Sequence, residues 1–543
     1  MLIQPVQLYR PRTGPTQRTR CRGTSSWRAR LWLAVAALVL ITPAGTPAAE
    51  PQPAAGSVDG DPRPSVPPNI IFIVLDTTRA DRMSYNGCER LTTPYIDAFA
   101  HDGVTYRNAH SVAPWTLPSH MSMFTGLLPG QHGAAWKAFA TPENMSLGEL
   151  LDKTFAFANP SNLLPERLKS VGYTTVGFSS NAWVSRRTGF DHGFDAFYEM
   201  WKEDTWVNKG YDWLPPRARH ALVSWLPLDV RSASELDRGD GGQVLTKLRE
   251  HVATHGPLRQ PFFLFFNFID PHYPYSPPPS WRYTYSDDRE LGEALALVRF
   301  DEMSMQAGLR PVDVTRFRPF YDAEITYLDF VVGHVFTWLR EQGLYEDALI
   351  VVTSDHGEHL GEGEHFSHQF SVEEELLRIP LVIKYPGNVG AGRTVDNQLV
   401  SNVDIYETIL HAAGGGSQAG TATAPQDLSN IDRFSRSYLI AEYDYSLPYL
   451  RLNQERNPAF SIDDNRVTRR VVYDATRRYE FLQRDGVQPA AAFAAPTDDP
   501  GRARAAAFLE SYVSSSGAGM LRESPEPLDA ATRERLRSLG YIH

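Results

Sequence analysis

The chain has 543 residues, enough to bury a large core and to form one large domain together with a smaller one. Hydrophobic residues make up 42% of it and charged residues 22%, which excludes a disordered chain and a bundle of membrane-spanning helices. The formal net charge of −11 disfavours general binding of nucleic acid or anionic lipid, so an anionic ligand would need a locally positive site.

The first 49 residues differ in composition from the rest. They contain seven arginines and no acidic residue, followed by the apolar run Leu31–Ile41 and the small-residue segment Thr42–Ala49. This order is typical of an export signal, and eleven apolar residues are too few to span a bilayer. We therefore expect an exported protein, periplasmic or secreted, with no stable membrane span; an uncleaved N-terminal anchor is the alternative.

Removal of this segment, residues 1–49, would change the formal net charge from −11 to −18, because it carries seven positive charges. Cys88 would be the one cysteine left, since Cys21 lies in the predicted signal, and no internal disulfide bond could form. Residues 50–68 are rich in Pro, Gly, Ser and Asp, which predicts a flexible linker.

Four apolar runs beyond the linker predict strands that are buried on both faces, as in a parallel sheet. They span residues 69–76, 173–179, 261–269 and 348–353. Apolar residues at helical spacing between Tyr321 and Gln342, and a helix expected over residues 163–172, place helices between them. The chain is therefore predicted to be an α/β sandwich, with a large, mostly parallel central sheet flanked by helices.

Each apolar run leads into a polar side chain. In chain order these are Asp76, Asn181, His272 and Asp355. Open α/β sheets carry their sites beyond the carboxyl ends of the strands, so we expect these four side chains to lie together.

The main domain is predicted over residues 69–415, and a smaller C-terminal α+β subdomain over residues 416–543. The stretches Arg187–Leu258 and Pro274–Phe317 are rich in Pro, Trp, Tyr and charged residues, and we expect them to be insertions that wall the site. Alternating apolar residues over Arg466–Leu482 predict a small antiparallel sheet in the subdomain.

Thr116 opens a segment that ends in the pair Thr125-Gly126, with Pro118 two residues after it. The segment predicts a hydroxyl on a tight turn ahead of a helix, close to backbone N–H groups that can receive an anion. A nucleophile needs this rigid placement. The alternative is a Pro-initiated helix that has Thr116 as its N-cap.

The segment from Thr116 to Gly126 resembles the signature of the sulfatase family, in the alkaline-phosphatase-like superfamily. In that family a Cys or Ser is followed by any residue, Pro, Ser and Arg, and later by a Thr-Gly pair. Thr116 stands in place of the Cys or Ser that is oxidised to formylglycine, and His120 in place of the Arg. Because threonine cannot become formylglycine, the chain is similar to the branches that use a metal-bound threonine.

The resemblance covers roughly residues 69–410 and includes two metal-binding segments. Val74–Asp81 is similar to the first, with Thr77 where many members have a second acidic residue, and Val351–Glu358 is similar to the second. The resemblance implies one divalent metal ion, held by Asp76, Thr116, Asp355 and His356. Two carboxylates and an imidazole favour Mn²⁺ or Zn²⁺, and Ca²⁺ is possible.

Two further histidines complete the implied site. His272 lies in Phe268–Tyr275, which is similar to the family segment that supplies a substrate-contacting histidine, and His368 precedes a Glu-Glu…Arg-x-Pro-Leu run that matches the family. One histidine would protonate the leaving oxygen and another would hold the anion. The implied catalytic residues are Thr116, His120, His272 and His368.

Arg79 and Asn181 are candidate substrate ligands. Arg79 could instead form a structural ion pair, and the same structural role is expected for Arg378. His359 and His365 lie in a segment crowded with His, Glu and Gly, which predicts a solvated loop.

The resemblance implies a metal-dependent hydrolase of sulfate esters or of phosphate mono- or diesters, with a metal-bound Thr116 as nucleophile and a small anionic ester as substrate. One alternative is a transferase that moves a phospho-headgroup onto cell-envelope lipids or glycans, which the short N-terminal apolar run disfavours. The other is a non-catalytic binding protein, which the complete set of metal-site residues and histidines disfavours. The absence of formylglycine favours phosphorus over sulfur.

Overall fold

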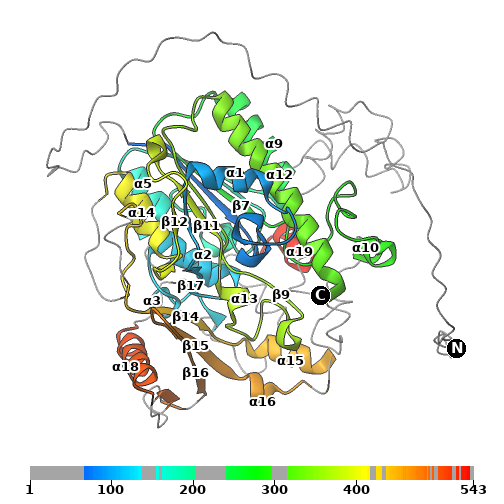
Figure 1. Cartoon of the computed structure of the whole chain (residues 1–543), viewed down its shortest axis with the longest axis vertical. Coiled ribbons are helices and arrows are strands. Elements are labelled where there is room, and N and C mark those ends of the chain that lie inside the picture. The colour runs from blue at the N-terminus through cyan, green and yellow to red at the C-terminus, as the bar shows by residue number, and fades with distance from the viewer. Residues whose placement is uncertain are drawn as a thin grey trace, which may run out of the picture. The chain divides into compact units, whose positions relative to one another are not determined.

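The computed structural model describes most of the chain beyond residue 66 (Figure 1). The described ranges are 67–136, 154–157, 162–202, 240–295, 315–415, 423–430, 436–456, 458, 460–485, 487–488, 492–493, 499–516, 521–524 and 528–538. The predicted export signal and nearly all of the predicted linker lie outside them. No helix within these ranges is both long and apolar enough to cross a membrane.

A central sheet of eight strands organises the chain (Figure 1). Its order is β12 (Thr394–Val395), β2 (Val104–Tyr106), β11 (Leu381–Lys384), β8 (Leu349–Thr353), β1 (Ile70–Leu75), β7 (Phe262–Phe268), β5 (Thr174–Ser179) and β6 (Ala196–Glu199). Strand β11 runs antiparallel to both of its neighbours, and the other adjacent pairs are parallel. The prediction of a large, mostly parallel sheet is therefore confirmed.

Helices cover both faces of this sheet. Helices α1 (Pro94–Asp102), α9 (Asp240–His255) and α12 (Arg318–Glu341) cover one face, and α2 (Thr116–Thr125), α5 (Leu164–Ser170) and α14 (Asp404–Ala412) the other. Alternate residues of β1 enter the two cores, because successive side chains of a strand point to opposite faces. This double burial explains why the central strands are apolar throughout.

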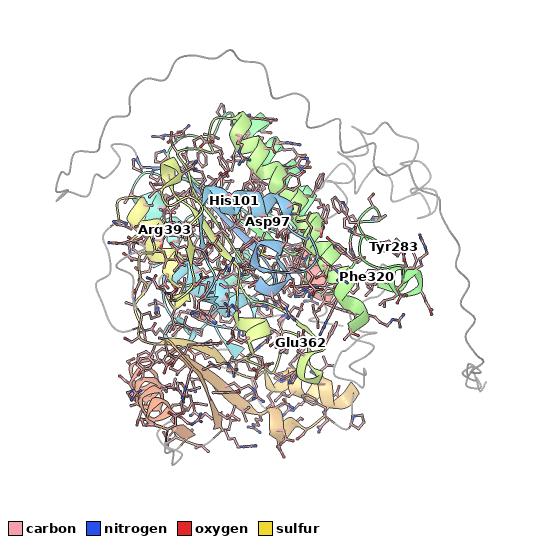
Figure 2. The ribbon with its side chains drawn as sticks, viewed as in Figure 1. Asp97, His101, Tyr283, Phe320, Glu362 and Arg393 are labelled. Carbon is pink, nitrogen blue, oxygen red and sulfur yellow. The ribbon has the colours of Figure 1, made fainter. Side chains whose placement is uncertain are left out.

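The stretch Arg187–Leu258 is not an insertion where the structure describes it. Strand β6 pairs with β5 at the edge of the central sheet, and α9 packs on the same sheet beside α12. The prediction was wrong because β6 is only four residues long and α9 begins at Asp240-Gly241-Gly242, which hides its apolar face. In the stretch Pro274–Phe317, α10 (Arg289–Leu295) packs near Phe320 of α12 and Tyr283 (Figure 2).

The predicted antiparallel sheet near the C-terminus is confirmed. It has the order β14 (Leu439–Tyr443), β15 (Val467–Tyr473) and β16 (Arg478–Arg484), and α18 (Pro500–Ser515) packs against it. Residues beyond 416 also join earlier parts of the chain, since β17 (Leu521–Ser524) pairs with β4 (Thr154–Phe157). Apart from short 3-10 helices, the remaining strands and helices of the described residues are β3 (Ala109–His110), α3 (Pro129–His132), β9 (His359–Leu360), β10 (Phe366–Ser367), α13 (Glu374–Leu377), β13 (Val400–Ser401), α15 (Leu447–Arg456), α16 (Ile462–Asn465) and α19 (Ala530–Ser538).

Candidate active site

Four neighbouring strands of the central sheet position the residues of the candidate site. Strands β8, β1, β7 and β5 are adjacent, and their carboxyl ends lead to Asp355, Asp76, His272 and Asn181, respectively. All four side chains are buried. The sheet order thus explains how residues up to 279 positions apart in the sequence come to one edge.

Asp76, Asp355 and His356 form a candidate metal centre. One ligand atom from each lies within 4.8 Å of the others. Asp76 Oδ1 and Asp355 Oδ2 are buried and accept no hydrogen bond within the described ranges. Two bare buried carboxylate oxygens are unfavourable unless a cation or a donor compensates them, so the three residues fit a divalent cation.

His356 is held in the tautomer that a metal ligand requires. Its Nδ1–H donates to the carbonyl of Gly357 at 2.8 Å, which leaves the Nε2 lone pair facing the site. Nε2 lies 3.4 Å from both Thr116 Oγ1 and Asp355 Oδ2. Burial lowers the pKa of His356 to about 4, so the ring is neutral at neutral pH. Gly357 is required sterically, since a Cβ there would lie 1.9 Å from the carbonyl oxygen of Glu375.

Thr116 begins α2, as predicted, and its hydroxyl faces this cluster. Asn181 Nδ2 donates to Asp76 Oδ2 at 2.8 Å and to Thr116 Oγ1 at 3.3 Å. The amide cannot be reversed, because its Oδ1 accepts from the backbone N–H of Trp183 at 2.9 Å. Asn181 therefore holds the Thr116 hydroxyl beside Asp76.

His120 lies one turn further along α2, and Asn267 fixes its tautomer. Asn267 Nδ2 donates to His120 Nε2 at 3.2 Å, so the ring proton is on Nδ1. His120 Nδ1 lies 3.1 Å from the carbonyl oxygen of Thr116 and 3.4 Å from Asp355 Oδ2. His120 thus contacts a candidate metal ligand rather than the hydroxyl of Thr116, and its predicted catalytic role stays a prediction.

The two carboxylates of the centre have opposite pKa shifts. Burial and the nearby charge of Asp355 raise the pKa of Asp76 well above its ordinary value. Burial also acts upward on Asp355, but His356, His120 and the N–H of Thr77 together hold its pKa below the ordinary value. Without a cation, the pair therefore resists carrying two negative charges.

A strained loop after β1 connects the centre to α12. Thr77 has a φ of +55°, which is unfavourable for a β-branched residue, and its N–H donates to Asp355 Oδ1 at 3.1 Å. The Tyr321 hydroxyl of α12 donates to the carbonyl of Thr77 at 2.6 Å and accepts from the N–H of Arg79 at 2.9 Å. Tyr321 therefore clamps both sides of the loop.

The contacts of Arg79 favour a structural role. Its guanidinium donates to Asp81, to Glu362 (Figure 2) and to the carbonyl of Glu358, at 2.7–3.0 Å. Arg378 is exposed and donates to the carbonyl of Arg107 at 2.7 Å. Anion binding by Arg79 remains a prediction that none of these contacts supports.

His272 and His368 lie beside His356. The ring centroids of His368 and His356 are 4.6 Å apart, and those of His368 and His272 are 5.2 Å apart. Burial lowers the pKa of both His272 and His368 to about 4, so both are neutral at neutral pH. Burial raises the pKa of Glu358, which hydrogen-bonds to His368, to about 7.

The prediction of a solvated loop was wrong for His359. Its side chain is 1% exposed, because the β9–β10 hairpin packs its Leu360 and Phe366 into an aromatic core with α12. The rings of His359 and His365 are 5.2 Å apart, and His365 is half-buried.

Three residues of the site were not predicted from the sequence. Asn267 is the one polar residue of the otherwise apolar β7, and this contrast could have identified it. Tyr321 lies on the expected helix among other buried aromatic residues, and Glu358 in a segment that looked solvated. Nothing in the sequence distinguishes these two from their neighbours.

Comparison with known proteins gives the family. The sequence model of the family named Sulfatase matches residues 68–415. The multifunctional alkaline phosphatase superfamily protein PehA of Trinickia caryophylli is 25% identical over 400 residues, which cover 64% of this chain and 74% of that protein. An arylsulfatase of Clostridium perfringens is 24% identical over 376 residues, covering 64% of this chain and 75% of that protein.

Solved structures show the same fold. The phosphonate monoester hydrolase of Agrobacterium radiobacter superposes with a TM-score of 0.56 at 19% identity, covering 82% of this chain and 95% of that one. A 2-O GAG sulfatase superposes with a TM-score of 0.53 at 17% identity, covering 83% of this chain and 92% of that one. The chain therefore belongs to the sulfatase family, in the alkaline-phosphatase-like superfamily, and is an ester hydrolase.

Proposed function

We propose that this chain is a metal-dependent hydrolase of phosphorus esters, namely phosphate mono- or diesters or phosphonate monoesters, with Thr116 as its nucleophile. One observation carries the proposal: the Thr116 hydroxyl begins α2 within 3.4 Å of His356 Nε2 and 3.3 Å of Asn181 Nδ2, at the edge where Asp76 and Asp355 meet. Threonine excludes formylglycine, which favours phosphorus, and the names of PehA and of the Agrobacterium enzyme are in line with this choice.

Asp76, Asp355 and His356, together with the Thr116 oxygen, would hold the cation. We favour Mn²⁺ or Zn²⁺ over Ca²⁺ because one donor is an imidazole. Such a cation supplies Lewis acidity, which lowers the pKa of a hydroxyl and offsets the charge of the ester. His356, neutral and locked by Gly357, is ready to donate its lone pair.

The reaction has two displacements. In the first, the oxygen of Thr116 bonds to phosphorus, its hydroxyl proton passes to Nε2 of neutral His272 or His368, and the bond from phosphorus to the alcohol breaks. The imidazolium formed in this way delivers that proton to the departing alkoxide. In the second, water attacks phosphorus and loses a proton to the same histidine, the bond to the Thr116 oxygen breaks, and the histidine returns that proton to Thr116.

Metal analysis together with turnover of matched aryl esters tests this proposal. The esters are a phosphodiester, a phosphonate monoester, a phosphate monoester and a sulfate with one common aryl leaving group. We expect close to one Mn or Zn per chain and turnover of a phosphorus ester. Thr116→Ala should lower kcat by about 10³-fold or more with metal retained, whereas Thr116→Ser should retain turnover.

Thr125→Ala is the matched control, because Thr125 lies in the same helix and its hydroxyl donates to the carbonyl of Met121 at 2.7 Å. Its turnover should equal that of the wild type. Sulfate turnover with bound Ca²⁺ would contradict the proposal. Bound metal without turnover of any ester would favour the headgroup transferase or the binding protein instead.

A further inference from the structure

Glu358 is a buried carboxylate that is hydrogen-bonded to a histidine of the site. Glu358 follows His356 by two residues and is fully buried. Its Oε1 accepts a hydrogen bond from Nδ1–H of His368 at 3.0 Å. A carboxylate is strongly disfavoured in such a place unless it is hydrogen-bonded, and the hydrogen bond to His368 is one of the contacts that hold this side chain.

The backbone around Glu358 is also fixed. The guanidinium of Arg79 donates to the Glu358 carbonyl at 3.0 Å, and the N–H of Gly357 donates to the carbonyl of Leu376 at 2.8 Å. Main chain and side chain are therefore both held, and the carboxylate presents a rigid acceptor to His368. A rigid acceptor is what an imidazole needs to keep one orientation.

With Nδ1 engaged by Glu358, the nitrogen of His368 that remains for chemistry is Nε2. The ring is restrained on its other sides by His356 and His272, whose centroids lie 4.6 and 5.2 Å away. Glu358 itself is outside the candidate metal centre, which among the described residues groups Asp76, Asp355 and His356.

We infer that Glu358 is a positioning residue: it fixes the tautomer and the orientation of His368, so that the free Nε2 can take up a proton and deliver it to the leaving oxygen of the ester. The inference rests on the proposed function and adds a residue to which that proposal gives no role. Glu358 acts through His368, so its effect on turnover must depend on His368.

A double-mutant cycle tests this dependence. Glu358→Met removes the acceptor at similar size, and Glu358→Gln retains an acceptor oxygen. Both are measured in the wild type and in His368→Ala, with aryl phosphodiesters whose leaving groups range from 4-nitrophenol to phenol. We expect kcat losses of about 100-fold for Glu358→Met and about 10-fold for Glu358→Gln on the phenyl ester, with KM and metal content unchanged.

Two features of these losses distinguish positioning from a structural role. The losses should shrink for the 4-nitrophenyl ester, which needs little protonation, and should vanish in the His368→Ala background. Glu375→Gln, a half-buried glutamate of α13, is the matched control and should have wild-type kcat. Equal losses with and without His368, equal losses on all leaving groups, or a loss of metal would each overturn the inference.

A measurement without turnover separates this inference from the proposed function. In the metal-loaded protein, ¹⁵N chemical shifts of labelled histidine should show His368 protonated at Nδ1, and Glu358→Met, which removes the acceptor, should change that signal. An unchanged signal would overturn the inference even if phosphorus esters are hydrolysed. Conversely, full activity of Thr116→Ala would refute the proposed nucleophile and leave the His368 signal as expected.

Discussion

Asn181 and Asn267 both donate to one oxygen of Asp76. Their Nδ2 atoms lie 2.8 and 3.3 Å from Oδ2, so Oδ1 is the oxygen left for a cation. Asn267 is itself fixed, because its Oδ1 accepts from the N–H of Asn181 at 3.2 Å and from the Ser179 hydroxyl at 3.3 Å. Neutral amides thus orient the candidate centre without adding charge to it, so positive charge there would have to come from a bound cation.

A second hydroxyl–histidine pair in the same helix is structural. Ser122 Oγ lies 2.9 Å from His132 Nε2, which looks like an activated serine. However, His132 Nδ1 accepts from the N–H of Ala134 at 3.0 Å, so Nε2 carries the proton and donates to Ser122. A nitrogen that already bears a proton cannot act as a base, and Thr116 remains the candidate nucleophile of α2.

His132 makes a pH prediction possible. Burial lowers its pKa from 6.5 to about 3. Between these two pH values the unfolded chain binds a proton at His132 that the folded chain does not bind. Its contribution to stability is fully present above pH 6.5 and is lost as the pH falls from 6.5 toward 3. His132→Gln should therefore reduce the slope of the unfolding free energy between pH 6.5 and 4 by about 1.4 kcal/mol per pH unit.

Urea unfolding at several pH values gives that slope. His101→Gln is the control, because His101 is exposed on α1 and its replacement removes no burial penalty (Figure 2). An identical slope in His132→Gln and the wild type would contradict the assignment.

Helix α12 does more than cover the sheet. Its Asp329 accepts from the N–H groups of Tyr95 and Ile96 at 3.0 and 2.8 Å, and so caps the first turn of α1 from 233 residues away in the sequence. Its Tyr321 clamps the strained loop at Thr77. Helix α12 thereby fixes both the strained loop at Thr77 and helix α1, which follows that loop in the chain.

Tyr321→Phe tests the clamp at the scale of the element. The ring would keep its packing against Tyr275, at a centroid distance of 5.4 Å, and the hydroxyl would be lost. We expect about 1–3 kcal/mol less stability, because the carbonyl of Thr77 and the N–H of Arg79 lose their partner. Since the loop carries Asp76, we also expect about 10-fold weaker metal binding in a chelator competition assay.

Tyr327→Phe is the matched variant on the same helix, because the Tyr327 hydroxyl accepts from the N–H of Gly242, far from the loop in sequence. It should lose stability but keep its metal affinity. If both variants bind metal as the wild type does, Tyr321 does not support the centre.

The sequence predicts most elements of this fold, and the reason is physical. A strand buried on both faces must be apolar throughout, and β1, β5, β7 and β8 are all found within two residues of the expected limits. The residues at their ends follow from the same rule. Short or edge elements such as β6 bury one face only and leave a weak pattern.

The sequence does not reveal which residues become hydrogen-bond partners. The hydrogen bond from His368 to Glu358 joins residues ten positions apart, and the clamp of Tyr321 on Thr77 joins residues 244 apart. Such pairs depend on how the elements pack, not on local composition. For the same reason the burial of His359, which results from the packing of a two-stranded hairpin, contradicted the expected solvated loop.

At the scale of the whole molecule, charge determines how an anionic ester can bind. The chain has a formal net charge of −11, and the site adds three buried acids, Asp76, Asp355 and Glu358, beside histidines that are neutral at neutral pH. An anion would be repelled from such a site. We therefore expect the protein to depend on a bound cation both for binding substrate and for stability.

Removal of metal should show both dependences. A chelator should abolish turnover and lower the melting temperature, because a cation that binds only the folded chain stabilises it by about 2.7 kcal/mol at 100 times its Kd. Thermal unfolding against Mn²⁺ or Zn²⁺ concentration measures this effect. Asp355→Asn should lose the metal-dependent shift, and a shift that persists in this variant would place the cation elsewhere.

The covalent intermediate gives the most direct test of the central claim, that Thr116 is the nucleophile. The protein is mixed with the phosphorus ester that it turns over fastest and quenched in acid within the first turnover, and its peptides are analysed by mass spectrometry. We predict a phosphoryl or phosphonyl adduct on Thr116 that is absent from Thr116→Ala. Steady turnover by the wild type with no adduct, or with an adduct on another residue, would contradict the mechanism.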